Sequence, residues 1–166
     1  GIPEPGDSLV FPDSPSNKLS NNNLSGAAYE DITISGSGYT LDGNSITVTG
    51  TLLVTGDNNT LDADVASAPI YFNDGTLVYN GQTTASFIVA GGATLKGTGT
   101  LGSTSVAGEL APGHSPGCMT VASLALTGTL TVEIDGPTAC TEYDRVTVTG
   151  GANLAGGNLQ LALGYI

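Results

Sequence analysis

Short groups of apolar residues at every second position recur along the chain from Ile32 onward. Gly and Asn are frequent between these groups, and both residues accept the positive φ angles that turns require. Each group therefore predicts a short, half-buried β-strand, and the pattern favours almost no helix. The groups are Ile32/Ile34, Ile46/Val48, Leu52/Val54, Ile70/Phe72, Leu77/Tyr79, Phe87/Val89, Leu124/Leu126, Leu130/Val132/Ile134, Val146/Val148 and Leu159/Leu161/Leu163.

The brevity of these strands and the small residues at the turns favour a parallel β-solenoid, in which each coil stacks on the one before it. We expect residues 1–25, which contain four prolines, to form an extended lead-in or cap. Residues 26–166 would form the β-helix domain. At about 20 residues per coil this domain holds seven or so coils. The similarity of residues 92–101 to residues 151–159 indicates a recurring coil.

A β-sandwich is the alternative architecture. The segment Asn73-Asp74-Gly75 lies between two strand-like runs, as the turn of a β-hairpin would. A sandwich requires such antiparallel pairs, whereas a solenoid requires parallel ones.

The charge of the chain bears on its partners. Its net charge is −12, and the only fixed cations are Lys18, Lys96 and Arg145. No basic surface is available to neutralise nucleic-acid phosphates or anionic lipid headgroups. We therefore expect no nucleic-acid partner and no membrane insertion, and an acidic surface that keeps a secreted protein soluble.

The two cysteines, Cys118 and Cys140, lie on either side of one strand-like run. Two cysteines in a Gly-, Thr- and Asn-rich chain of secreted composition predict a disulfide rather than a catalytic thiol. Two buried free thiols are the alternative.

The ends of the chain carry further expectations. Residues 1–5 have neither the basic nor the apolar region of a signal peptide, so an exported protein would have this sequence as a mature or trimmed form. Residues 159–166 end inside a strand-like segment without a polar cap, which is typical of a fragment of a longer β-helix.

The segment 110–117, with Pro112-Gly113 followed by Ser115-Pro116-Gly117, places two tight turns a few residues apart. Together with the alternating residues 124–134 and the segments 143–151 and 157–163, it resembles the autotransporter-associated β-strand repeat, also called the passenger-associated transport repeat. Weaker likeness extends back to residues 6–12 and 32–48. The resemblance implies a right-handed parallel β-helix in a bacterial surface or secreted protein, in which the repeat is structural. The two cysteines depart from the pattern of an autotransporter passenger.

Few residues suggest chemistry. His114, the only histidine, lies between the two turns and is expected to be an exposed turn residue rather than a catalytic base. Acids on one side of a solenoid can form the paired carboxylates of polysaccharide-cleaving enzymes. Such an enzyme would need three or more acids beside Lys96 or Arg145, and we expect none. The acids considered are Asp42, Asp57, Asp62, Asp64 and Asp74.

Three of these acids, Asp57, Asp62 and Asp64, are weak calcium candidates, because carboxylates suit that ion although their order fits neither the EF-hand loop nor the Gly-Gly-x-Gly-x-Asp nonapeptide. A solvated turn is preferred, and no cofactor is expected. A sugar-stacking strip would need aligned aromatic residues, and an ice-binding face would need aligned Thr-x-Thr pairs. The candidates are Tyr39, Tyr71, Tyr79 and Phe87 for the strip, and Thr47/Thr49, Thr98/Thr100, Thr129/Thr131 and Thr147/Thr149 for the face.

The sequence thus predicts a non-enzymatic structural or adhesive β-solenoid segment, extracellular or on a bacterial cell surface. Its expected partners are further coils or copies of itself, since an open β edge pairs readily, and surface glycans or host cells. End-to-end assembly into filaments follows from this expectation. A carbohydrate- or ice-binding module is the main alternative.

Overall fold

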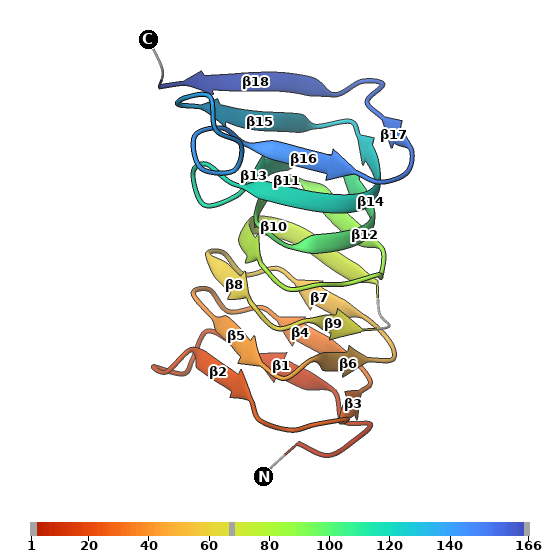
Figure 1. Cartoon of the computed structure of the whole chain (residues 1–166). Helices are drawn as coiled ribbons and strands as arrows, with labels where there is room; N and C mark the ends of the chain where they lie inside the picture. Colours follow the sequence, from red (N-terminus) through yellow and green to blue (C-terminus); the bar gives the residue numbers. More distant parts are fainter. Residues whose placement is uncertain (1–2, 67–68, 165–166) are drawn as a thin grey trace.

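The computed structural model describes residues 3–66 and 69–164. These residues form short strands joined by turns, and they include no helix that could span a membrane. The strands pair in parallel from coil to coil and stack as a β-solenoid of about six turns, compared with the seven or so expected. Figure 1 shows the coils rising from the N-terminus at the bottom to β18 at the top. The prediction of a parallel β-helix is confirmed, and its right-handed sense remains an expectation from the resemblance to the autotransporter-associated β-strand repeat.

The strands lie on three faces of the solenoid. The first face is formed by β1 (Leu9–Phe11), β4 (Ile32–Ile34), β7 (Leu52–Val54), β10 (Ile70–Tyr79), β11 (Phe87–Gly97), β12 (Thr100–Val106), β14 (Cys118–Leu126) and β17 (Ala152–Asn153). The second is formed by β2 (Leu19–Asn22), β5 (Thr40–Gly43), β8 (Asn59–Leu61), the later parts of β10 and β11, β13 (Glu109–Pro112), β15 (Thr129–Ile134) and β18 (Asn158–Leu163). The third contains β3 (Ala28–Tyr29), β6 (Ile46–Val48), β9 (Val65–Ala66), the early parts of β12 and β14, and β16 (Arg145–Val148).

Parallel pairing excludes the β-sandwich. The segment Asn73-Asp74-Gly75 is not a hairpin turn but a corner inside β10, whose two halves pair with β7 and β8 below and with β11 above. A register shift between Phe72 and Asp74 marks the corner. Asn, Asp and Gly favour any sharp change of direction, so the local sequence does not distinguish a corner from a hairpin.

Residues 1–25 are more regular than an extended lead-in. They contain β1, which pairs with β4, and β2, which pairs with β5, so the first coil of the solenoid begins within them. Leu9 and Phe11 flank the exposed Val10 and pack against the core. Pro12 and Pro15 follow β1 at a corner, where a missing N–H costs no ladder hydrogen bond.

Inward-facing side chains form continuous apolar columns. Ile32, Leu52, Ile70 and Phe87 are stacked in register on the first face, and each is at most 1% exposed. Each such side chain contributes roughly 1.5–3 kcal/mol by burial. The hydroxyl of Tyr79 is buried in this core without a hydrogen-bond partner among the described residues, and burial raises the pKa of Tyr79 well above its ordinary value.

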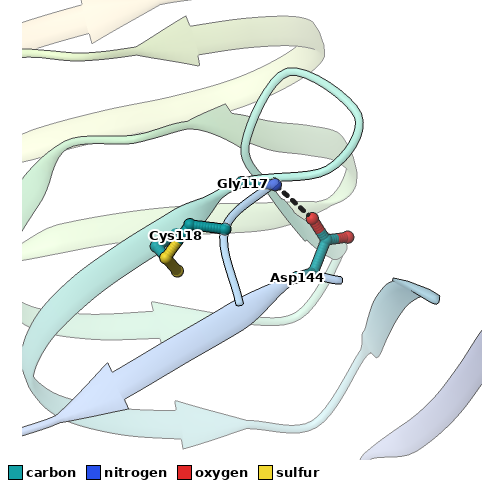
Figure 2. Close-up of a disulfide and its surroundings, with 4 residues drawn as sticks. Gly117, Cys118 and Asp144 are labelled. Atoms are coloured by element: carbon teal, nitrogen blue, oxygen red, sulfur yellow. Dashed lines mark hydrogen bonds between the residues drawn. A yellow bond between two sulfur atoms is a disulfide. The ribbon is translucent and has the colours of Figure 1, made fainter. Parts of the chain in front are cut away.

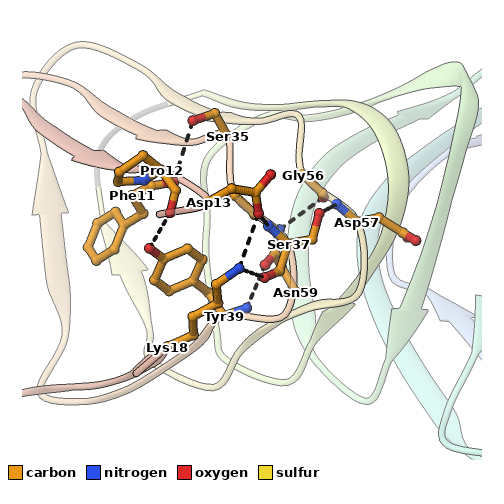
Figure 3. Close-up of polar contacts among 11 residues, drawn as sticks. Phe11, Pro12, Asp13, Lys18, Ser35, Ser37, Tyr39, Gly56, Asp57 and Asn59 are labelled. Atoms are coloured by element: carbon orange, nitrogen blue, oxygen red, sulfur yellow. Dashed lines mark hydrogen bonds and ion pairs between the residues drawn. The ribbon is translucent and has the colours of Figure 1, made fainter. Parts of the chain in front are cut away.

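The corner between the first and second faces is held by polar groups as well as by glycines (Figure 3). The buried side chain of Asn59 accepts a hydrogen bond from Tyr39 N at 2.8 Å and donates to Gly36 O at 3.0 Å and Gly56 O at 2.9 Å. It therefore satisfies backbone groups of two coils at once. Asp13 of the first coil accepts hydrogen bonds from the Ser37 N–H of the second coil and from the Lys18 ammonium, and both lower the pKa of its carboxyl.

The internal similarity between residues 92–101 and 151–159 does not mark equivalent coil positions. Residues 92–95 belong to β11 on the second face, where Leu95 is fully buried. Residues 152–153 form β17 on the first face, and Leu154 is 53% exposed. Coils do recur along the chain, but these two segments occupy different positions in their coils, because a motif of small residues and one leucine fits either a corner or a strand.

Candidate functional site

The last full coil is longer than the others. Residues stacked on the first face are 17 to 23 positions apart from Leu9 up to Leu124, whereas Leu124 and Ala152 are 28 apart. The additional residues form a loop at 135–144, between β15 and β16. Insertions in solenoids form loops on one face, often the face that binds a ligand.

A disulfide fixes this loop. Cys118 at the start of β14 is bonded to Cys140 in the loop, with Cα atoms 4.9 Å apart, so the predicted pairing is confirmed (Figure 2). Closing a loop of this size stabilises the fold by about 3 kcal/mol in the chain-entropy model. Backbone hydrogen bonds from Asp135 N to Glu142 O and from Cys140 N to Tyr143 O give the loop further internal order.

Asp144 joins the end of the loop to the body of the solenoid. Asp144 is 6% exposed, and one of its oxygens accepts a hydrogen bond from Gly117 N at 2.6 Å (Figure 2). The other oxygen accepts from Glu133 N at 2.8 Å. Hydrogen bonds to an ionised acceptor are the stronger class, so two of them fix three segments of chain together. This role of Asp144 could not be predicted from the sequence, because Gly117 and Glu133 are 27 and 11 residues away along the chain.

The segment 113–117, which carries the Pro-Gly and Ser-Pro-Gly motifs, forms a tight turn projecting between β13 and β14. Gly113 and Ser115 have positive φ angles of 84° and 78°. Gly113 and Gly117 approach so closely that a Cβ on either would lie 2.3 Å from the other's Cα. Because Asp144 binds Gly117 at the base of this turn, the exposed residues at its tip, His114 and Ser115, are held in place.

A cavity of about 240 Å³ lies on the second face beside this turn. Its charged side chains are one ammonium and three carboxylates, so its net charge is −2. Its apolar lining comes from aliphatic side chains of two coils, those of β10 and β13. The residues lining it are Val78, Lys96, Glu109, Ala111, Pro112, Gly113, His114, Ser115, Thr131, Glu133 and Asp144.

Hydrogen bonds between coils orient the polar groups of this cavity. Thr131 Oγ1 donates to Glu109 Oε1 at 2.5 Å, and Ser115 Oγ donates to Glu133 Oε1 at 2.7 Å. The carboxylates therefore already bind hydroxyl groups, and each has lone pairs for more.

His114 is oriented by Asn80, whose Oδ1 lies 3.0 Å from the ring Nε2. Asn80 Oδ1 also accepts from Thr98 N, and Asn80 Nδ2 donates to Asp62 Oδ1 at 2.7 Å, which fixes which way the amide points. Since an amide oxygen only accepts, His114 Nε2 carries a proton and Nδ1 of the neutral ring is left as an acceptor. His114 is an exposed turn residue, as predicted, and it is also one wall of the cavity.

The acids singled out in the sequence lie elsewhere. Asp57 Oδ1 accepts from Thr76 N, Asp62 Oδ1 from Asn80 and Asp64 Oδ1 from Gln82 N, so each of the three calcium candidates binds the coil above it. Across residues 3–66 and 69–164 no three acidic, histidine or cysteine side chains are grouped as a metal site would need. Asp42 and Asp74 are exposed, and each accepts a hydrogen bond from the glycine that follows it.

The four aromatic candidates do not share a surface, and the threonine candidates are aligned only in part. Of the four candidates, Tyr39, Tyr79 and Phe87 are buried and Tyr71 is 38% exposed, so these four residues do not form a sugar-stacking strip. Thr129 is paired with Glu109 and Asn158, and Thr47 is paired with Ala28 and Ala66. On the third face, however, Thr100, Thr120 and Thr147 are paired in register from coil to coil. Whether the aromatic residues or the threonines align depends on the register between coils, and the sequence of one short strand does not determine that register.

Three acids do gather near Lys96, but they are Glu109, Glu133 and Asp144 rather than the aspartates considered from the sequence. Both oxygens of Asp144 are occupied by backbone N–H groups. The arrangement offers hydrogen-bond donors and acceptors to a polar ligand. Comparison with models of protein families, with curated proteins and with solved structures finds no match.

Proposed function

We propose that the chain is a structural or adhesive segment of a secreted or surface-exposed bacterial protein, and that its solenoid is extended by stacking end to end with a second copy. The resemblance to the autotransporter-associated β-strand repeat supports the first part. The disulfide is in keeping with an oxidising, extracellular environment. The second part rests on the end strand β18.

The apolar columns continue to the edge of β18. Leu159, Leu161 and Leu163 are stacked on Leu130, Val132 and Ile134, and they are 64%, 51% and 67% exposed. The outer edge of β18 also offers backbone N–H and C=O groups that pair readily with another strand. This exposed strand is the observation that carries the proposal.

The other end of the solenoid is suited to receive it. A cavity of about 540 Å³ opens at the first coil and is lined in part by Leu9, Phe11 and Tyr29. All strands run in parallel from coil to coil, so β18 of one copy can meet the first coil of the next with the same strand direction as within the solenoid. Such a head-to-tail contact repeats without closing and gives a filament.

Sedimentation velocity over a wide concentration range, with electron microscopy, tests the stacking. We expect oligomers that grow with concentration in the unaltered chain and a monomer for Leu161→Lys, which places a charge in the inward column. Ala162→Lys is the matched control, because Ala162 lies between the inward leucines on the same strand. A chain that stays monomeric at high concentration with full β-structure, or equal assembly by both variants, would overturn the proposal.

A further inference from the structure

Three departures from a regular coil meet at the cavity on the second face. They are the turn at 113–117, the loop at 135–144 and the disulfide that fixes the loop. Through Asp144 the loop holds both Gly117, at the base of the turn, and the backbone of Glu133, on the cavity floor. The turn, the loop and the disulfide are not required for one coil to stack on the next, because the other coils stack without them. A rigid, preorganised wall is what a binding site needs, because it reduces the ordering cost of binding.

The cavity presents both donors and acceptors. The Lys96 ammonium has three N–H donors, and it makes no hydrogen bond or ion pair within the described part of the chain. Glu133 accepts from Ser115 through Oε1, which leaves Oε2 free, and His114 Nδ1 adds another acceptor in the neutral ring. Hydroxyl groups, which donate and accept at once, match this set.

The net charge, the aliphatic wall and the volume of the cavity limit the class of ligand that it can bind. A net charge of −2 on the lining disfavours phosphates, sulfates and acidic sugars. Val78, Ala111 and Pro112 supply an apolar wall for a C–H face. The volume, about 240 Å³, lies below the usual range for drug-sized ligands and suits a single small ring.

We propose that this cavity binds one uncharged hexose unit of a glycan. Lys96 and Glu133 hydrogen-bond its hydroxyls, and the aliphatic wall contacts its C–H face. The site differs from an aromatic sugar-stacking strip, and it is independent of end-to-end stacking because it lies on the side of the solenoid.

Saturation-transfer NMR with the methyl glycosides of glucose, galactose and mannose tests the site at millimolar concentrations, where a few direct hydrogen bonds give measurable affinity. The Leu161→Lys background separates the result from stacking. We expect transfer from at least one glycoside, and none from glucuronate. Glu133→Gln, which keeps a carbonyl acceptor for Ser115, and Lys96→Met should each weaken binding at least tenfold.

Glu30→Gln is the matched control, since Glu30 is exposed in an early coil and its side chain lies outside the cavity lining. Circular dichroism establishes that each variant retains its β-structure. Absence of transfer from all three neutral glycosides would overturn the assignment. So would equal binding by the cavity variants and the control, or binding of a lysine-rich peptide in place of the sugars.

Discussion

Replacing Gly128 with alanine tests how closely the coils approach at the corner between the first and second faces. A Cβ at this position would lie 1.9 Å from Gly108 O and 2.5 Å from Ala107 O. Ordinary Cβ contacts begin at 3.4 Å, so the two coils must separate by about 1.5 Å to admit the methyl group. The obstacle is backbone, which cannot rotate away as a side chain would.

The cost follows from the bonds at this corner. Thr127 N and Gly128 N both donate to Val106 O, at 2.9 Å and 3.1 Å, and Thr129 N donates to Gly108 O at 2.9 Å. At about 1 kcal/mol each, weakening these three bonds costs roughly 3 kcal/mol. Overpacking adds about 1–3 kcal/mol, and the reduced entropy of the unfolded chain offsets about 0.4–1 kcal/mol. We expect Gly128→Ala to lower the free energy of unfolding by about 3–6 kcal/mol.

Urea denaturation followed by far-UV circular dichroism measures this loss. Gly151→Ala is the matched control, because its Cβ would meet nothing within 4 Å and its φ angle is not in the left-handed region. The control should be neutral or stabilising by up to about 1 kcal/mol. A free energy of unfolding for Gly128→Ala within about 0.5 kcal/mol of that of the unaltered chain would refute the reasoning, because substitutions at unconstrained surface positions have effects of that size.

Asp144→Ala should lower the free energy of unfolding by about 3–5 kcal/mol, because it leaves the buried N–H of Gly117 and the half-buried N–H of Glu133 without their charged acceptor, and Asp144→Asn by about half as much. Urea denaturation beside the exposed control Asp42→Asn checks this, and a loss below about 1 kcal/mol for the alanine variant would contradict it. Tyr79→Phe should raise stability near neutral pH by about 1 kcal/mol, because it removes a buried hydroxyl without a partner. Since burial raises the pKa of Tyr79, above about pH 10 the unfolded state loses a proton that the folded state keeps, so stability falls as pH rises there. Denaturation at neutral and alkaline pH should show a smaller decline for Tyr79→Phe, and parallel declines would count against the raised pKa.

The sequence predicted the strands and the column they form. Ile32, Ile34, Leu52 and Val54, chosen by period-2 alternation, are all at most 1% exposed. The alternation identifies the inward-facing residues because each strand has one buried and one exposed face, so every second residue is apolar. The disulfide could also be predicted, because a chain with only two cysteines allows only one pairing.

The site depended on register, which the sequence does not contain. Lys96, Glu109 and Glu133 lie in three different coils, and they line one cavity because Lys96 pairs beside Ala111 and Glu109 beside Thr129. Coils of 17 to 23 residues drift in length, so counting at a fixed period misplaces residues after one or two coils. Only the Pro-Gly and Ser-Pro-Gly turns gave a local signal, and they marked the rim without indicating the carboxylates.

A solenoid can carry a lateral site without weakening its core, because its inward and outward residues have separate tasks. In β15, Leu130, Val132 and Ile134 continue the apolar columns while Thr131 and Glu133 line the cavity. Changes to the outward residues leave the column intact, so a site can be assembled from successive coils at little cost in stability. The loop at 135–144 is the exception, since it is an insertion that must be ordered on its own. Its ordering is supplied by the disulfide and Asp144, which is why these two features, rather than the column, determine whether the wall of the cavity is rigid.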